Sequence, residues 1–153
     1  MSTTAPTNLA EWQALADTLS FETRAYINDT FVDAQRGATL STVNPATGEV
    51  LAEVASCDDA DAELATHAAR QAFDRGEWSR RAPAQRKATL LELAALMQAH
   101  RHELALLDTL DMGKPITSAL GDIDGAIGCL RYTAESIDKL YGEVAPTGDQ
   151  HLG

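Results

Sequence analysis

The stretch Thr109–Pro115, which reads TLDMGKP, contains a glycine followed by a lysine, the pair found at the end of a phosphate-binding P-loop. A P-loop also needs a glycine five residues before this pair and a hydroxyl residue directly after the lysine, to hold magnesium. Asp108 and Pro115 occupy these two positions, and neither residue can do that work. We therefore expect Gly113 to end a helix in the left-handed conformation, with Lys114 at the negative helix end and Pro115 preventing continuation.

A second glycine-rich segment, GDIDGAIG at Gly121–Gly128, could suggest a dinucleotide-binding loop. Its glycines have the wrong spacing for that fingerprint, and the segment does not follow an expected strand. We expect these glycines to allow close helix packing instead.

The two cysteines are the candidate nucleophiles. Cys129 lies one step from the apolar stripe of an expected helix, which favours a buried structural thiol over an exposed reactive one. Cys57 lies just before a helix start, where the helix dipole would activate it, but Asp58 and Asp59 beside it act in the opposite direction. Neither cysteine has the setting of a catalytic nucleophile.

His100, His102 and Glu103 form the one cluster of histidines with an acid. Residues two apart on a helix point about 200° apart, so a shared metal ion is not expected here. No Ser-His-Asp arrangement can be assembled from the histidines either, because no serine elbow accompanies them. We interpret the cluster as a polar junction between two helices.

Composition limits the classes of function. The chain has 153 residues, 44% of them apolar, and its 23 acidic against 12 basic residues give a net charge of −11. This charge disfavours binding to nucleic acid or to an anionic membrane surface. The amino terminus lacks the features of an export signal, two cysteines are too few for a disulfide scaffold, and no apolar run approaches the ~20 residues that span a bilayer. These features predict a cytoplasmic protein.

The hydrophobic periodicity predicts an α/β chain that is rich in helices and has short β-hairpins near its start. Residues 1–8 are expected to be disordered, and Asn28-Asp29 is expected to form a tight turn, where Asp29 fits a left-handed position less comfortably than glycine. Asp59 or Asp61 is expected to cap the first long helix, and the next is expected to kink or split near His100. The expected helices are 9–19, 58–76, 83–110 and 122–141, the last capped by Asp122, and the expected strands lie within 25–34, 39–45 and 49–56. Spacing alone indicates no reaction.

Several stretches, in order and correctly separated, resemble the amino-terminal segment of the aldehyde dehydrogenase superfamily. The resemblance covers about residues 24–146 and rests on these motifs: AYINDTFVDA, VNPATGEVLAEV, AARQAFDRGEWSRRAPAQRKATLLELAALM, ELALLDTLDMGKPI and LRYTAESIDKLYGE. The leading helix LAEWQALADTL, the GEWS sequence and the ending IDKLYGEVA are most similar to the γ-glutamyl-γ-aminobutyraldehyde dehydrogenases of putrescine degradation.

The resemblance implies an NAD- or NADP-dependent oxidation of an aldehyde to a carboxylic acid. In the family, a cysteine thiolate attacks the aldehyde, hydride passes to the nicotinamide, and a glutamate activates the water that hydrolyses the thioester. The family motifs that carry these groups, namely PWN, ELGGK, GQxC and GSTxxG, do not occur in this sequence. No catalytic or cofactor-binding residue is therefore assigned to this chain, and residues 9–153 are expected to form part of the amino-terminal, cofactor-binding domain, truncated before those motifs.

One ligand site is implied by the resemblance. Many family members hold a structural monovalent cation through the valine carbonyl of VNP and the acid of LDxGKP, which here are Val43 and Asp111. Hard cations favour such oxygen ligands. The alternative is that Asp111 is a solvated acid at a helix end, where it would oppose the helix dipole.

Two hypotheses follow. In the first, the chain is the amino-terminal fragment of an aldehyde dehydrogenase that acts on an aminoaldehyde, is inactive alone, and forms a homodimer or tetramer at full length through a bridging strand beginning near Glu143. In the second, it is a non-catalytic interaction module that pairs with full-length subunits through the edge at residues 143–146.

Overall fold

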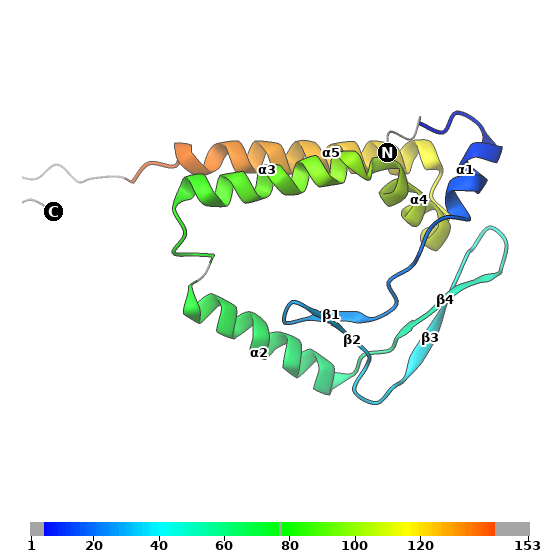
Figure 1. The fold of residues 1–153 in the computed structure, drawn as a ribbon, viewed down its shortest axis with the longest axis horizontal. Coiled ribbons are helices and arrows are strands. Elements are labelled where there is room, and N and C mark those ends of the chain that lie inside the picture. The colour runs from blue at the N-terminus through cyan, green and yellow to red at the C-terminus, as the bar shows by residue number, and fades with distance from the viewer. Residues whose placement is uncertain (1–4, 77, 143–153) are drawn as a thin grey trace, which may run out of the picture.

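The computed structural model describes residues 5–76 and 78–142. Three helices pack together on one side of the molecule, and two small sheets with a further helix lie on the other side (Figure 1). The element order confirms the expected helix-rich α/β fold, in which hairpins are followed by three to four helices; four follow them in the part of the chain that the structure describes. The elements are α1 (Leu9–Ala16), β1 (Ala25–Ile27), β2 (Thr30–Val32), β3 (Thr39–Val43), β4 (Val50–Ala55), α2 (Asp59–Arg75), α3 (Pro83–Ala99), α4 (Arg101–Met112), α5 (Ile116–Ser136) and a 3-10 turn, η1 (Ile137–Lys139). The strand expected near Glu143 lies outside the described residues.

Both sheets are antiparallel pairs of strands that are adjacent in the sequence. In the first, β1 pairs with β2 through a turn in which Asn28 and Asp29 have φ values of 52° and 62°, as the sequence predicted. Left-handed backbone at both turn positions matches the twist of the strands. In the second, β3 pairs with β4 around the turn at residues 44–48, where Gly48 has a φ of 77°.

A reciprocal capping arrangement starts α2. The N-cap is Asp58, whose carboxylate accepts a hydrogen bond from the Ala60 amide at 2.9 Å. Asp61, in the first turn, accepts from the Asp58 amide at 3.0 Å. The prediction that Asp59 or Asp61 caps the helix was wrong about the N-cap, which is Asp58. Asp61 makes the second half of a capping box, because its carboxylate reaches back to the backbone of the N-cap residue. Gly76, with a φ of 70°, ends the helix.

The division of the long helical segment at His100 was predicted correctly. α3 starts with Pro83 in its first turn, and α4 starts at Arg101 after His100, whose φ of −102° departs from helical geometry. α4 then ends at Gly113, with a φ of 74°, where a side chain would also lie 2.9 Å from the ring of Pro45.

The start of α5 differs from the prediction. The helix begins at Ile116 with Pro115 as its N-cap, six residues before Asp122. The Pro115 carbonyl accepts from the amides of Ser118 and Ala119, so the break at Gly113 and Pro115 already resets the backbone. Asp122 instead lies within the helix and forms an ion pair with Lys114.

The end of α5 also differs from the prediction. The helix passes into η1 after Ser136, so Tyr141 lies beyond it and is 86% exposed.

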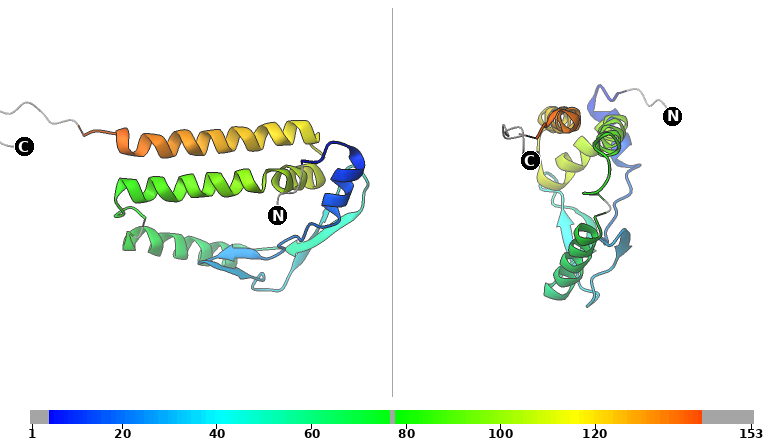
Figure 2. Two further views of the ribbon diagram at one scale, coloured as in Figure 1. Left: turned by 45° about the horizontal axis from the view of Figure 1, so that its top comes forward. Right: turned by 90° about the vertical axis from the view of Figure 1, so that its left-hand side faces the viewer.

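The core lies where α3, α4 and α5 meet, and α3 and α5 run side by side in both views of Figure 2. Its buried residues are mostly alanines, which let the helices approach closely. The buried apolar residues of these helices are Ala94, Ala105, Leu106, Ala119, Ile127 and Ala134, and Ala34, in the loop after β2, is buried separately. No helix among the described residues is long and apolar enough to cross a membrane.

Candidate functional site

The structure brings the two predicted cation ligands to the same region. The C-terminal end of α4 lies against the end of β3, where the Thr42 hydroxyl donates a hydrogen bond of 2.5 Å to the Asp111 carboxylate. Val43 is the next residue along β3, and a side-chain carbon added at Gly113 would lie 2.9 Å from the Pro45 ring. Residues 69 apart in the sequence therefore meet at one surface point. A carboxylate and nearby main-chain carbonyls are the oxygen donors that hard cations prefer.

The histidine cluster is a helix junction, as the sequence predicted. The His100 Nδ1 lies 2.9 Å from the Glu103 carboxylate, within one turn of the junction between α3 and α4. The His102 ring faces Trp12 of α1, with the ring centroids 5.8 Å apart. A cavity of about 370 Å³ lies between α1 and this junction, and Leu15 contributes to its lining. Within residues 5–76 and 78–142, no group of three histidine, cysteine or acidic side chains is arranged to hold a metal ion.

Both cysteines are exposed. For Cys129 the prediction of a buried thiol was wrong. Ile127, which is 2% exposed, faces the packed helices, and a residue two positions later on a helix points about 200° away from it. The apolar stripe is buried at Ile127 and Ala134, but its centre lies farther from Cys129 than the sequence indicated.

The glycines of the same helix also differ from expectation. At Gly121, Gly125 and Gly128, an added side-chain carbon would meet nothing within 4 Å among the described residues. They therefore do not serve close packing within the part of the chain that the structure describes.

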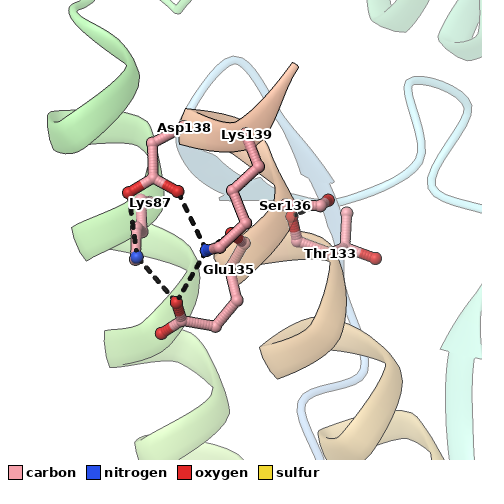
Figure 3. A network of polar contacts seen from close by, with 6 residues as sticks. All are labelled: Lys87, Thr133, Glu135, Ser136, Asp138 and Lys139. Atoms are coloured by element: carbon pink, nitrogen blue, oxygen red, sulfur yellow. Dashed lines mark hydrogen bonds and ion pairs between the residues drawn. The ribbon is translucent and has the colours of Figure 1, made fainter. Parts of the chain in front are cut away.

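A polar network that sequence reasoning missed joins α3 to the end of α5 (Figure 3). The Lys87 ammonium lies 2.7 Å from the Glu135 carboxylate and 3.1 Å from the Asp138 carboxylate. The Lys139 ammonium lies 3.2 Å from Asp138 and also donates to the Glu135 backbone carbonyl. Hydrogen bonds from Lys87 lower the pKa of the Glu135 and Asp138 carboxyls. The same two hydrogen bonds raise the pKa of Lys87.

These groups stabilise one another's charged forms, which favours ion pairs that hold α3 against the end of α5 over proton transfer between them. The sequence alone could have predicted one ion pair of this network, because Glu135 and Lys139 are four residues apart on a helical segment. The contribution of Lys87, 48 residues earlier, has no local signature.

A second interhelical pair joins α4 to α5. Arg101 makes two parallel contacts to Asp124, with Nε to Oδ1 at 2.5 Å and Nη2 to Oδ2 at 2.6 Å. The hydrogen bonds that Arg101 donates lower the pKa of the Asp124 carboxyl. This bidentate geometry fixes the orientation of the two helices as well as their distance.

Comparison with protein-family models matches residues 31–153 to the aldehyde dehydrogenase family. The chain belongs to the aldehyde dehydrogenase family. Among its aldehyde dehydrogenase relatives, it is 49% identical over 146 residues to the NADP/NAD-dependent aldehyde dehydrogenase PuuC of Escherichia coli K12, covering 95% of this chain and 30% of PuuC. It is 48% identical to the aminoacetaldehyde dehydrogenase of Pseudomonas aeruginosa, covering 93% of this chain and 29% of that protein.

Solved aldehyde dehydrogenases share the fold. The γ-glutamyl-γ-aminobutyraldehyde dehydrogenase of Burkholderia cenocepacia J2315 matches with a TM-score of 0.87 and 49% identity, over 91% of this chain and 28% of that chain. The P. syringae indole-3-acetaldehyde dehydrogenase AldA, solved with NAD⁺ and IAA, matches with a TM-score of 0.87 and 50% identity, over 92% and 28% of the two chains. The chain thus spans about 30% of the length of the relatives it matches. The resemblance to the amino-terminal segment of the family is confirmed.

Proposed function

We propose that this chain is the amino-terminal part of an NAD(P)-dependent aldehyde dehydrogenase that oxidises an aminoaldehyde to the carboxylic acid, and that the 153-residue chain alone is inactive. The observation that carries the proposal is the near-50% identity to two relatives over more than nine tenths of this chain. The name of the P. aeruginosa relative, aminoacetaldehyde dehydrogenase, and that of the B. cenocepacia structure point to aldehydes that carry an amino or substituted amino group.

The architecture supports assigning the chemistry to other parts of the complete enzyme. Cys57 and Cys129 are both exposed, but neither lies in the GQxC sequence that carries the family's nucleophile. The charged clusters are satisfied by interhelical partners. We infer that residues 9–153 contribute a structural share of the cofactor-binding domain. The relatives are enzymes, so they support this hypothesis and give no support to a stand-alone interaction module.

The test compares two proteins. The 153-residue chain is assayed alone, and a chimera joins it to the remaining 70% of PuuC at the matched boundary. With aminoacetaldehyde and either NAD⁺ or NADP⁺, the chimera is expected to form reduced cofactor and the isolated chain is expected to form none. Turnover by the isolated chain, or a folded chimera without turnover on any of several aldehydes, contradicts the proposal.

We further propose a structural monovalent cation at Asp111 and the Val43 carbonyl. The support is the contact between β3 and the end of α4, which gathers oxygen atoms from both elements. The chimera is expected to unfold at a higher temperature in sodium or potassium chloride than in tetramethylammonium chloride of equal ionic strength. Asp111→Ala is expected to abolish this difference, and a difference that survives the substitution refutes the site.

The complete enzyme is proposed to be a cytoplasmic homo-oligomer. Equilibrium sedimentation of the chimera tests the second part, and a strictly monomeric chimera contradicts it.

A further inference from the structure

The cavity between α1 and the junction of α3 with α4 combines an apolar interior with an acidic rim. Its volume is about 370 Å³. Half-buried Pro6, Leu15 and His102 line its deeper part, and the exposed side chains of Glu11 and Glu103 line its rim. Small-molecule sites in proteins enclose about 300–1,000 Å³, so this cavity has room for one small ligand.

The two rim carboxylates each keep one oxygen atom available. The Glu11 Oε2 atom accepts hydrogen bonds from the amide and the hydroxyl of Thr7, at 2.6 and 2.9 Å. The Glu103 Oε2 atom lies 2.9 Å from Nδ1 of His100. Within residues 5–76 and 78–142, the Oε1 atoms of both glutamates have no hydrogen-bond partner. The hydrogen bonds from Thr7 also lower the pKa of Glu11, which favours its charged form.

Charge complementarity favours a cationic ligand. Among the described residues, no lysine or arginine lines the cavity, and Arg101 at the junction is already paired with Asp124. The net charge of −11 also attracts small cations toward the protein. An inorganic cation gains nothing from the apolar interior, whereas an organic cation removes its carbon chain from water there. The cavity therefore suits a ligand that has one charged end and one apolar end.

We propose that this cavity binds a protonated primary alkylamine, with its ammonium group at the Glu11–Glu103 rim and its carbon chain against Pro6 and Leu15. An ammonium group has three donors and no acceptor, which matches a rim of carboxylate oxygens. α1 itself has no buried residue, so a ligand that contacts both α1 and the helix junction holds α1 in place. The inference goes beyond the proposed function, because the amine is bound here and not oxidised.

Hydrogen exchange followed by mass spectrometry tests the site in the chimera with PuuC. The probe is n-butylammonium chloride, added over a concentration series at constant ionic strength. At ten times its dissociation constant, it is expected to slow exchange of the α1 amides about tenfold, because the ligand must leave before α1 opens. The controls are n-butanol, which has the same carbon chain without the charge, and sodium chloride. Both are expected to leave the exchange rates nearly unchanged.

Three variants locate the binding. The double variant Glu11→Gln and Glu103→Gln keeps the shape of the rim and removes its charge, so the slowing is expected to disappear. Glu92→Gln is the matched control, because Glu92 is an exposed acid of α3 that does not line the cavity. This variant is expected to keep the full slowing. Leu15→Phe fills the cavity and keeps both carboxylates, so it is expected to abolish the slowing if the double variant fails to fold.

Three results overturn the proposal. They are the absence of slowing with butylammonium, equal slowing with n-butanol, and slowing that survives the loss of both rim carboxylates or the filling of the cavity. The readout does not depend on turnover. An inactive chimera whose α1 is protected by butylammonium refutes the proposed function alone, and an active chimera without this protection refutes the amine site alone.

Discussion

Replacing Asp61 by alanine is expected to destabilise the chain more than any change at its acidic neighbours in the first turn of α2. Asp61 is 2% exposed, and its two carboxylate oxygens accept hydrogen bonds of 3.0 Å from the amides of Gln35 and Asp58. Alanine leaves both amides without these acceptors, at a cost of about 1–2 kcal/mol each, so the free energy of unfolding is expected to fall by about 2–4 kcal/mol. This is a large fraction of the stability of a small domain.

Asp59→Ala is the matched control, because Asp59 also lies in the first turn but is exposed. Its loss removes only a favourable interaction with the helix dipole, at a cost of about 0.5 kcal/mol. Urea unfolding followed by far-UV circular dichroism measures both variants. Equal losses for the two variants would refute the argument that the buried carboxylate joins the loop after β2 to the start of α2.

Three further changes have separate expected outcomes. Gly113→Ala is expected to lower the unfolding free energy by about 1 kcal/mol more than Gly48→Ala in the same urea assay, because both glycines have positive φ but only Gly113 also faces a proline ring. A hydrogen bond from Arg24 lowers the pKa of the Glu22 carboxyl to about 2. NMR titration is therefore expected to show this carboxyl charged down to about that pH, and Arg24→Gln is expected to return its pKa toward 4.5. Lys87→Met is expected to raise the pKa of both network carboxyls and to speed hydrogen exchange at the end of α5, whereas an unchanged exchange rate would contradict the attachment role of the network.

The sign of the pH effect at Glu22 follows from its lowered pKa. The folded form binds this proton less readily than the unfolded form, so the stabilisation is fully present above pH 4.5 and is lost as the pH falls toward about 2. A Glu22 carboxyl that titrates near 4.5 in the folded chain would contradict the contact with Arg24.

Local backbone signals made much of the fold predictable. Asn28-Asp29, Gly76 and Gly113 adopt the left-handed conformations expected of turn and cap positions, and the helical segment divides at His100. Each of these features is decided by a few neighbouring residues. Sequence reasoning placed them because the physical cause lies within the same short segment.

Features that depend on packing could not be predicted in the same way. The exposure of Cys129 depends on which face of α5 meets α3 and α4, and a shift of the stripe by a fraction of a turn reverses the outcome. The contact of Thr42 with Asp111 joins residues 69 apart, and no local pattern in either segment predicts that the two meet. The resemblance to a known family, and not local spacing, identified Asp111 as a candidate ligand.

Among residues 5–76 and 78–142, each strand pairs with its neighbour in the sequence, and this has a consequence for how the chain folds during synthesis. β1 pairs with β2 and β3 with β4, so each hairpin closes a short loop and carries a small entropic cost. Contacts of this kind form quickly, and a chain that emerges from the ribosome from its amino terminus presents them in order. Both hairpins are therefore expected to be in place while the later helices are still being synthesised, which gives the growing polypeptide an ordered edge before its main hydrophobic core exists.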